Sequence, residues 1–382
     1  MPGLMQAFLD QSHLDGFLFV GESYGDADMY YLSRFLAGDR FALLVGEKTT
    51  TLLVSSMELG RARKESCAER CLSTSEFHLL DKLRSGKRPD EAYAQVLGEF
   101  LSRCSIRRLG VACSFPAGIY RCLEQDFRIQ ILESPAAQIR EIKSPVELQA
   151  VSVTQRACER AMRRAIRLIA GSTVRGEKLY RQDEPLTSEA VRQAIELSLI
   201  QDGCEAVDTI VAGGRQAADP HARGTGPLAA HAPIVIDIFP RSRSSRYFAD
   251  MTRTVLKGEA SAEVLELYRA VQMAQEAGLT AVREGATGSE VHRQVSDTFQ
   301  DLGYAEREGS GFTHSTGHGV GLEVHERPSL GEAGGALKSG QVVTVEPGLY
   351  YPDIGGVRLE DLVVVEESGC HNLTRFQKKL VV

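Results

Sequence analysis

The chain has 382 residues, which is more than one ordinary hydrophobic core organises, so two globular domains are expected. Its 43% hydrophobic and 25% charged residues are typical of a globular protein, and its net charge of −7 argues against a nucleic-acid-binding surface. It has neither an N-terminal signal segment nor a run of ~20 apolar residues that could span a membrane, so we expect a cytoplasmic protein.

The first part of the chain alternates short apolar runs with helical stretches. Strands are predicted at residues 17–20, 41–45, 51–54 and 109–111, and a helix at 91–101. This pattern is typical of a small α/β domain. It contains no combination of residues that indicates chemistry. The eight cysteines of the chain are scattered rather than paired, which favours reduced thiols.

A domain boundary is predicted near residue 140. Ser144, Pro145 and Glu147 have the spacing of an N-cap, a proline at the first helical position and a capping glutamate, so a long helix should begin there. We therefore assign residues 1–140 to an N-terminal α/β domain and residues 141–382 to a C-terminal α+β domain.

The second domain mixes helices and strands. Helices are predicted near 188–202 and 261–278. A further helix should follow the capping box that begins at Thr287, and its apolar stripe is Val291, Val295, Phe299 and Leu302. Strand-like runs lie at 209–212, 234–239, 342–345 and 362–365.

Five potential metal ligands lie along this domain, each in its own short motif. They are Asp237 in Val-Ile-Asp-Ile-Phe, Asp250 in Phe-Ala-Asp-Met-Thr-Arg-Thr, His318 in His-Gly-Val-Gly-Leu-Glu-Val-His-Glu, Glu346 in Thr-Val-Glu-Pro-Gly and Glu360 in Gly-Val-Arg-Leu-Glu-Asp. Each is weak evidence by itself, since an Asp after a strand usually caps a turn. Together they hold four carboxylates, which could be buried only at high cost without cations. Two divalent ions are therefore expected, and an oxygen-rich set with one nitrogen suits Mn, Co or Zn.

These motifs resemble those of the M24 metallopeptidases, the pita-bread family of prolidase (Xaa-Pro dipeptidase), aminopeptidase P and methionine aminopeptidase. The resemblance runs from about residue 140 to the C-terminus and extends, in layout only, to the first domain. It implies a creatinase/prolidase-like N-terminal domain, a C-terminal pita-bread catalytic domain and a homodimer. The size of the N-terminal domain favours the prolidase and aminopeptidase P branch over methionine aminopeptidase.

The resemblance also implies how the metal ligands would work. Two ions would be bound by five residues, with Asp250 and Glu360 bridging them; the full set is Asp237, Asp250, His318, Glu346 and Glu360. A hydroxide shared by the ions would attack the Xaa-Pro bond. Glu346 would act as the general base and pass the proton to the leaving imino nitrogen.

Other residues match family positions near the substrate. His221 and His325 match histidines that contact the substrate and the scissile carbonyl, and we expect both to take part in catalysis. His314 matches a further histidine of the pocket. Arg358 matches an arginine near the site, where a substrate-binding role and a structural role as partner of a ligand carboxylate are equally open.

Two departures from the family pattern concern the substrate. Asp237 and Asp250 lie farther apart than usual, which lengthens the basic loop 240–247, and its arginines could reach the pocket mouth or a neighbouring subunit. Ser329 stands where prolidases commonly carry an arginine that clamps the carboxylate of a dipeptide, and Arg327 could take over that role. We expect a prolidase-type dipeptidase, with aminopeptidase P activity on longer Xaa-Pro peptides as the alternative.

Two further alternatives fit the resemblance less well. Creatinase-type hydrolases share the two-domain layout but replace the metal positions, whereas all five are retained here. A catalytically inactive pita-bread module that binds other proteins would typically have lost ligands.

Overall fold

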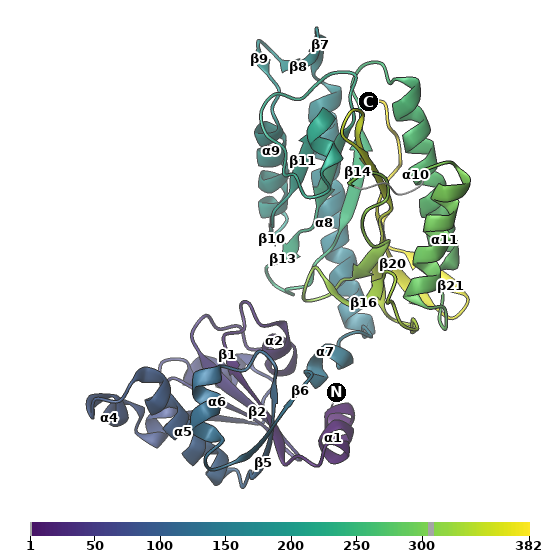
Figure 1. Cartoon of the computed structure of the whole chain (residues 1–382). Coiled ribbons are helices and arrows are strands. Elements are labelled where there is room, and N and C mark those ends of the chain that lie inside the picture. Colours follow the sequence, from purple (N-terminus) through teal and green to yellow (C-terminus); the bar gives the residue numbers. More distant parts are fainter. Residues whose placement is uncertain (1, 305–308) are drawn as a thin grey trace. The chain divides into compact units, whose positions relative to one another are not determined.

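The computed structural model describes residues 2–304 and 309–382, and the chain divides into two compact units, Met1–Arg140 and Glu141–Val382 (Figure 1). No helix in the described part of the chain is both long enough and apolar enough to cross a lipid bilayer.

The first unit is a six-stranded mixed sheet flanked by helices (Figure 1). Its strands are β1 Gly16–Gly21, β2 Phe41–Gly46, β3 Thr50–Val54, β4 Arg70–Ser73, β5 Arg108–Ala112 and β6 Arg128–Leu132. Its helices are α1 Pro2–Gln11, α2 Ala27–Ser33, α3 Leu59–Glu65, α4 Leu79–Arg84, α5 Pro89–Arg103, α6 Ala117–Leu123 and α7 Pro135–Ile139, with a 3-10 turn η1 at Thr74–Phe77. The strand order is β4-β3-β2-β1-β5-β6. The four predicted strands and the predicted helix, now α5, are confirmed.

The core of this unit forms where α5 packs on the sheet. Val96, Leu97 and Phe100 on one face of α5 are fully buried, and they join a cluster with strand residues such as Leu18 and Leu109. The helix is amphipathic because its apolar residues recur every three to four positions.

The second unit is built on four long helices. They are α8 Pro145–Ala170, α9 Ser188–Gln201, α10 Ala262–Ala281 and α11 Gly288–Asp301, and a 3-10 turn η2 lies at Gly214–Ala218. Helices α8 and α9 pack together in teal on one side of the strands, and α10 and α11 pack together in green on the other (Figure 1). Helix α8 begins where predicted, because Ser144 and Glu147 form a reciprocal capping box with Pro145 at the first position.

The strands between these helices are short. They are β7 Thr173–Arg175, β8 Lys178–Arg181, β9 Glu184–Pro185, β10 Cys204–Glu205, β11 Ile210–Gly213, β12 Ile234–Ile238, β13 Arg241–Ser242, β14 Met251–Val255, β15 Gly317–Gly319, β16 Glu326–Leu330, β17 Val342–Val345, β18 Gly348–Tyr351, β19 Gly355–Arg358, β20 Asp361–Glu366 and β21 Gly369–Asn372. Two sheets matter for the site, one in the order β11-β12-β14 and one in the order β16-β15-β17-β20-β21.

One sequence prediction about α11 is wrong in its last member. Val291, Val295 and Phe299 are buried as expected, but Leu302 is 38% exposed. The helix ends at Asp301, so Leu302 is its C-cap residue and no longer part of the buried helical face, and Gly303 follows with a φ of +85° that ends the helix.

The basic loop 240–247 is tied down by one glutamate. Arg241 Nη2 lies 2.7 Å from Glu205 Oε2, and Arg246 Nη1 lies 3.1 Å from Glu205 Oε1. Strand β13 inside the loop also pairs with β10. Glu205, which is distant in sequence, therefore binds both arginines. The expectation that arginines of this loop reach the pocket mouth or a neighbouring subunit stays a prediction.

Candidate metal centre

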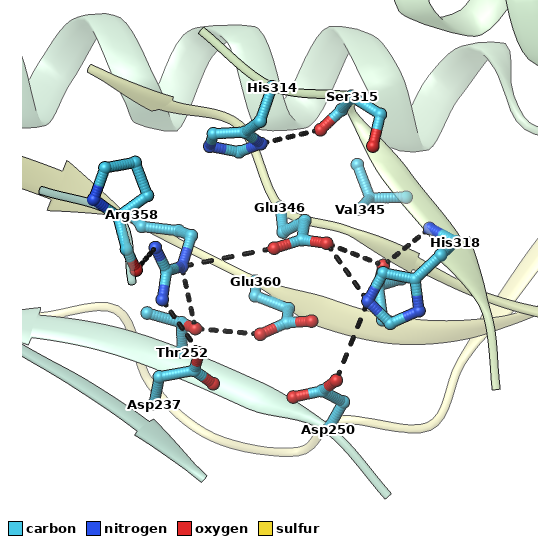
Figure 2. A network of polar contacts seen from close by, with 12 residues as sticks. Asp237, Asp250, Thr252, His314, Ser315, His318, Val345, Glu346, Arg358 and Glu360 are labelled. Carbon is cyan, nitrogen blue, oxygen red and sulfur yellow. Dashed lines mark hydrogen bonds and ion pairs between the residues drawn. The ribbon is translucent and has the colours of Figure 1, made fainter. Parts of the chain in front are cut away.

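One cavity of about 330 Å³ in the second unit is lined by all five potential metal ligands, named here the ligand set: Asp237, Asp250, His318, Glu346 and Glu360. Figure 2 shows their side chains turned toward one another from several strands. The same cavity is lined by four further predicted residues, His221, His314, His325 and Arg358. The structure thus brings together every predicted site residue except Arg327.

The two aspartates meet because β12 and β14 are paired antiparallel. Asp237 lies opposite Thr252 in this pairing, and Asp250 lies two residues before Thr252. Since alternate residues of a strand point to the same face, Asp237, Thr252 and Asp250 share one face of the sheet. The long loop between the strands leaves this register intact.

The two glutamates meet at the ends of a second antiparallel pair. Val345 of β17 lies opposite Asp361 of β20, and the next positions outward are Glu346 and Glu360. The backbone N–H of Glu360 donates to the carbonyl of Thr252 at 3.1 Å, which joins this pair to the aspartate sheet. Rigid strands rather than flexible loops therefore position the carboxylates.

The buried carboxylates repel one another, and a bound cation would stabilise their ionised forms. Burial raises the pKa of Asp250 and Glu360 well above their ordinary range, and neighbouring carboxylates add to the effect. Burial also raises the pKa of Asp237, against the opposing charge of Arg358. Among the described residues, the buried oxygens Asp237 Oδ1 and Glu360 Oε1 have no hydrogen-bond partner.

His318 lies beside two of the carboxylates of the ligand set. Its Nε2 lies 3.2 Å from Glu346 Oε1 and 3.8 Å from Asp250 Oδ2. Burial works against ionisation of both partners, but their contact raises the pKa of His318 and lowers the pKa of Glu346 to about 2. Asp250, His318 and Glu360 each offer an atom within 4.8 Å of the others. One imidazole and buried carboxylate oxygens that lack a hydrogen-bond partner in the described part of the chain fit a divalent metal ion.

Arg358 is a buried partner of the ligand set. Its Nη2 donates to Asp237 Oδ2 at 2.7 Å, and its Nε donates to Thr252 Oγ1 at 3.2 Å. Thr252 in turn donates to Glu360 Oε2 at 2.8 Å. Of the two roles that the sequence left open for Arg358, these contacts support that of a structural partner for a ligand carboxylate.

His314 is engaged on both ring nitrogens. Its Nδ1 lies 2.7 Å from the Ser315 carbonyl, which can only accept, so Nδ1 carries the proton. Its Nε2 lies 2.9 Å from the Tyr350 hydroxyl, which itself accepts from Arg358 Nη1 at 2.9 Å. Burial lowers the pKa of His314, in agreement with a neutral ring. His314 therefore lies in the pocket as predicted, but its hydrogen bonds go to the protein.

His221 and His325 differ from His314, because both are exposed residues in the cavity wall. The His325 ring stands edge-on to the His318 ring, with centroids 4.2 Å apart. Burial and the neighbouring His318 lower the pKa of His325, so its ring is neutral near pH 7 and can donate one hydrogen bond.

Ser329, which departs from the family pattern, and Arg327, its possible substitute, lie away from the cavity wall. The Arg327 side chain is 56% exposed, and its Nη1 lies 4.0 Å from Glu141 Oε1. Ser329 is also exposed, and the described residues that line the cavity include neither of the two.

Two residues of the network were missed from the sequence, Thr252 and Tyr350. Thr252 links Arg358 to Glu360, and Tyr350 links Arg358 to His314. Thr252 could have been found, because it lies two residues after Asp250 and must share its face. Tyr350 carries no such local signal.

Comparison with known proteins decides the family. The profile of Metallopeptidase family M24 matches residues 149–367, and that of the Creatinase/Prolidase N-terminal domain matches residues 4–142. The chain belongs to metallopeptidase family M24. The predicted family and the two-domain fold, with a creatinase/prolidase-like domain before a pita-bread domain, are thereby confirmed.

Relatives of this M24 metallopeptidase align along its whole length. The Xaa-Pro dipeptidase of Pyrococcus horikoshii is 29% identical over 379 residues, covering 98% of this chain and 96% of the relative. The solved prolidase from Pyrococcus horikoshii OT3 superimposes with a TM-score of 0.82 at 26% identity, covering 99% of both chains. The X-Pro aminopeptidase from Thermotoga maritima superimposes with a TM-score of 0.80 at 27% identity, covering 97% of this chain and 98% of the other.

The stabilisation that metal gives this metallopeptidase is expected to grow with pH. Without metal, Asp250, Glu360 and His318 have raised pKa values, so their contribution to stability is present at low pH and is lost as the pH rises through those values. Glu346 acts in the opposite sense, but only below its ordinary pKa of 4.5. A metal ion competes with these protons for the same side chains, so its affinity rises as the groups lose their protons at higher pH.

The measurement is thermal unfolding in Mn²⁺ and in EDTA from about pH 5 to 8. The gap between the two midpoints should widen as the pH rises, whereas groups outside the site affect both curves alike. A gap that does not change with pH would contradict the assigned pKa directions.

Proposed function

We propose that this metallopeptidase is a prolidase-type dipeptidase, which hydrolyses the peptide bond before proline in Xaa-Pro dipeptides. The observation that carries the proposal is the convergence of the whole ligand set on one small cavity. Its volume of about 330 Å³ lies at the low end of ligand pockets, which span roughly 300–1,000 Å³, and so suits a short substrate. The named Xaa-Pro dipeptidase and prolidase relatives support the same substrate class.

The ligand set, Asp250 and Glu360 among it, would hold two divalent ions. Mn, Co and Zn all suit its carboxylates and single imidazole. Such ions would supply Lewis acidity toward the scissile carbonyl and would activate water near neutral pH. The cluster supports this assignment because its carboxylates are buried, mutually repelling and in part without protein partners.

The remaining steps belong to side chains of this chain. Glu346 would take the proton of the attacking water and pass it to the imino nitrogen of proline, because its carboxylate lines the cavity beside His318 and the other members of the ligand set. His325 would donate to the oxygen of the scissile carbonyl as negative charge develops there. His221, on the same wall, would contact the substrate and help to orient it. Arg358 would hold Asp237 in place.

Two further features are part of the proposal. We infer a homodimer from the family layout, and gel filtration of the purified chain tests it. A cytoplasmic location is supported by the eight cysteines, all of which are free thiols, as expected in a reducing compartment.

The decisive assay is hydrolysis of Ala-Pro and Leu-Pro by the purified protein. Cleavage is expected with added Mn²⁺ or Co²⁺ and should cease in EDTA, because the buried carboxylates repel one another without cations. Release of free proline is measured. Activity that survives chelation, or a protein that binds no metal, would show that the two-metal assignment is wrong. Metal binding without any turnover would favour an inactive pita-bread binding module.

A second candidate function is that of aminopeptidase P, which acts on longer Xaa-Pro peptides. The observation in its favour is that Arg327, the proposed clamp for a dipeptide carboxylate, is exposed and does not line the cavity. Ala-Pro, its C-terminal amide and Ala-Pro-Pro separate the two functions. A dipeptidase should reject the amide, whereas equal rates on all three would favour the aminopeptidase. If the amide is rejected, Arg327→Ala shows whether this arginine is the clamp.

A further inference from the structure

Lys143 is a buried cation at the start of the second unit, outside the cavity. Its side chain is 1% exposed, and its Nζ lies 2.5 Å from Glu326 Oε1, whose side chain is 4% exposed. Nζ also donates to the Glu141 carbonyl at 3.1 Å. The Lys143 backbone N–H donates to the Gly340 carbonyl at 2.9 Å, just before β17. A buried ammonium and carboxylate tolerate burial only as a pair.

Glu326 stands at the base of the loop that carries His325. It is the first residue of β16 and pairs with Gly319 of β15, where the register shifts after His318. Its carboxylate turns back over the loop, and Oε2 accepts from the Glu323 backbone N–H at 3.5 Å. A Cβ on Gly321 would lie 2.4 Å from Glu326 Oε1, so only glycine leaves room for the carboxylate.

His325 is the residue directly before Glu326, so this arrangement fixes the position of its backbone. Its ring rests edge-on against His318, one of the ligand set, and faces the cavity. The loop is also held at its other end, where Phe248 N–H donates to the Gly321 carbonyl at 2.8 Å. The Lys143–Glu326 pair therefore fixes the side of the loop on which His325 lies.

We propose that Lys143 is a positioning residue for His325, acting through Glu326. Without the ammonium, the Glu326 carboxylate would be a buried charge lacking its nearest cation and would turn toward water. The Glu323 N–H would then lose its acceptor, and the loop would no longer hold the His325 ring over the site. The proposal rests on the donor role given to His325 under the proposed function.

The test compares Lys143→Met with wild type in the full-length, metal-loaded protein. With Ala-Pro as substrate, kcat should fall about 10- to 100-fold, the size expected when a reacting group is displaced by about 1 Å. KM should change little. The ring ¹H–¹⁵N signals of His325, assigned by their loss in His325→Gln, should shift or broaden in NMR spectra of both metal-free and Zn-loaded protein.

Two further variants separate positioning from stability. Arg246→Met removes another buried cation, 4% exposed, that pairs with Glu205 away from the cavity. It should lower the midpoint of thermal unfolding but leave kcat and the His325 signals unchanged. The double variant Lys143→Met/Glu326→Met replaces the buried pair by apolar side chains and should fold even if the single variant does not. It should still show the lower kcat and the altered His325 signals.

The proposal is overturned if either folded Lys143 variant keeps the wild-type kcat and the wild-type His325 signals, whatever happens to its unfolding midpoint. If wild type fails to cleave Ala-Pro, the proposed function fails, and the NMR comparison still decides whether the pair positions the ring.

Discussion

Replacing Asp250 by asparagine is expected to lower peptidase activity by more than about 100-fold while making the metal-free protein more stable. Loss of residues that merely support metal ligands costs about 10- to 100-fold in affinity or activity, so loss of Asp250, a proposed metal ligand itself, should exceed that range. Stability should move the other way, because burial and the charges of Glu360 and Asp237 disfavour ionised Asp250 in the folded state. The amide removes that charge with little change of shape.

Activity on Ala-Pro and urea unfolding in EDTA at about pH 8 measure the two effects. Asp361→Asn is the matched control, since Asp361 is equally buried but pairs with Arg253 at 2.8 Å and with Lys378 at 2.8 Å. Although burial opposes it, these cations lower the pKa of Asp361. Its contribution to stability is present above the ordinary pKa of 3.8, so the control should be destabilised at pH 8. If Asp250→Asn lowers the free energy of unfolding as much as Asp361→Asn does, repulsion between the buried carboxylates is not what destabilises ionised Asp250.

Replacing Arg358 by methionine is expected to destabilise the metal-free protein by about 3–5 kcal/mol, the range found when one partner of a buried ion pair is removed. Asp237 would lose its 2.7 Å partner, and the Tyr350 hydroxyl and Pro220 carbonyl would lose a donor. Bound metal should reduce the loss, because it gives Asp237 another cation. The measurement is the free energy of unfolding in EDTA and in Mn²⁺.

Arg358→Lys is the companion variant, because it keeps the charge but cannot reproduce the planar fork of donors. It should recover part of the stability of Arg358→Met. The alternative role for Arg358 makes a different prediction. If Arg358 mainly binds substrate, Arg358→Met should keep wild-type stability and raise KM alone.

The local parts of the fold could be predicted from the sequence because their causes are local. Helices α8 and α11 begin at the capping boxes of Ser144 and Thr287, and each box depends only on a partner three residues further along the chain. Apolar runs predicted the strand that contains Asp237 and the two strands that Glu346 and Glu360 directly adjoin. The end of α11 was misjudged because the apolar periodicity was extended to Leu302, one residue past the end of the helix, where Gly303 then adopts a left-handed backbone conformation.

The sequence by itself also identified the five candidates of the ligand set, since each lies in a short motif and four carboxylates with one histidine indicate metal chemistry. What it could not determine is which partner each polar group chooses. Arg358 binds Asp237 from 121 positions away, Arg246 binds Glu205 from 41, and Lys143 binds Glu326 from 183. Such choices depend on how strands pair and sheets pack, because a buried charge takes the nearest complement that the assembled chain supplies. Only the tertiary structure therefore decided that Arg358 supports a carboxylate, that His314 is engaged by Tyr350, and that Lys143 anchors the loop of His325.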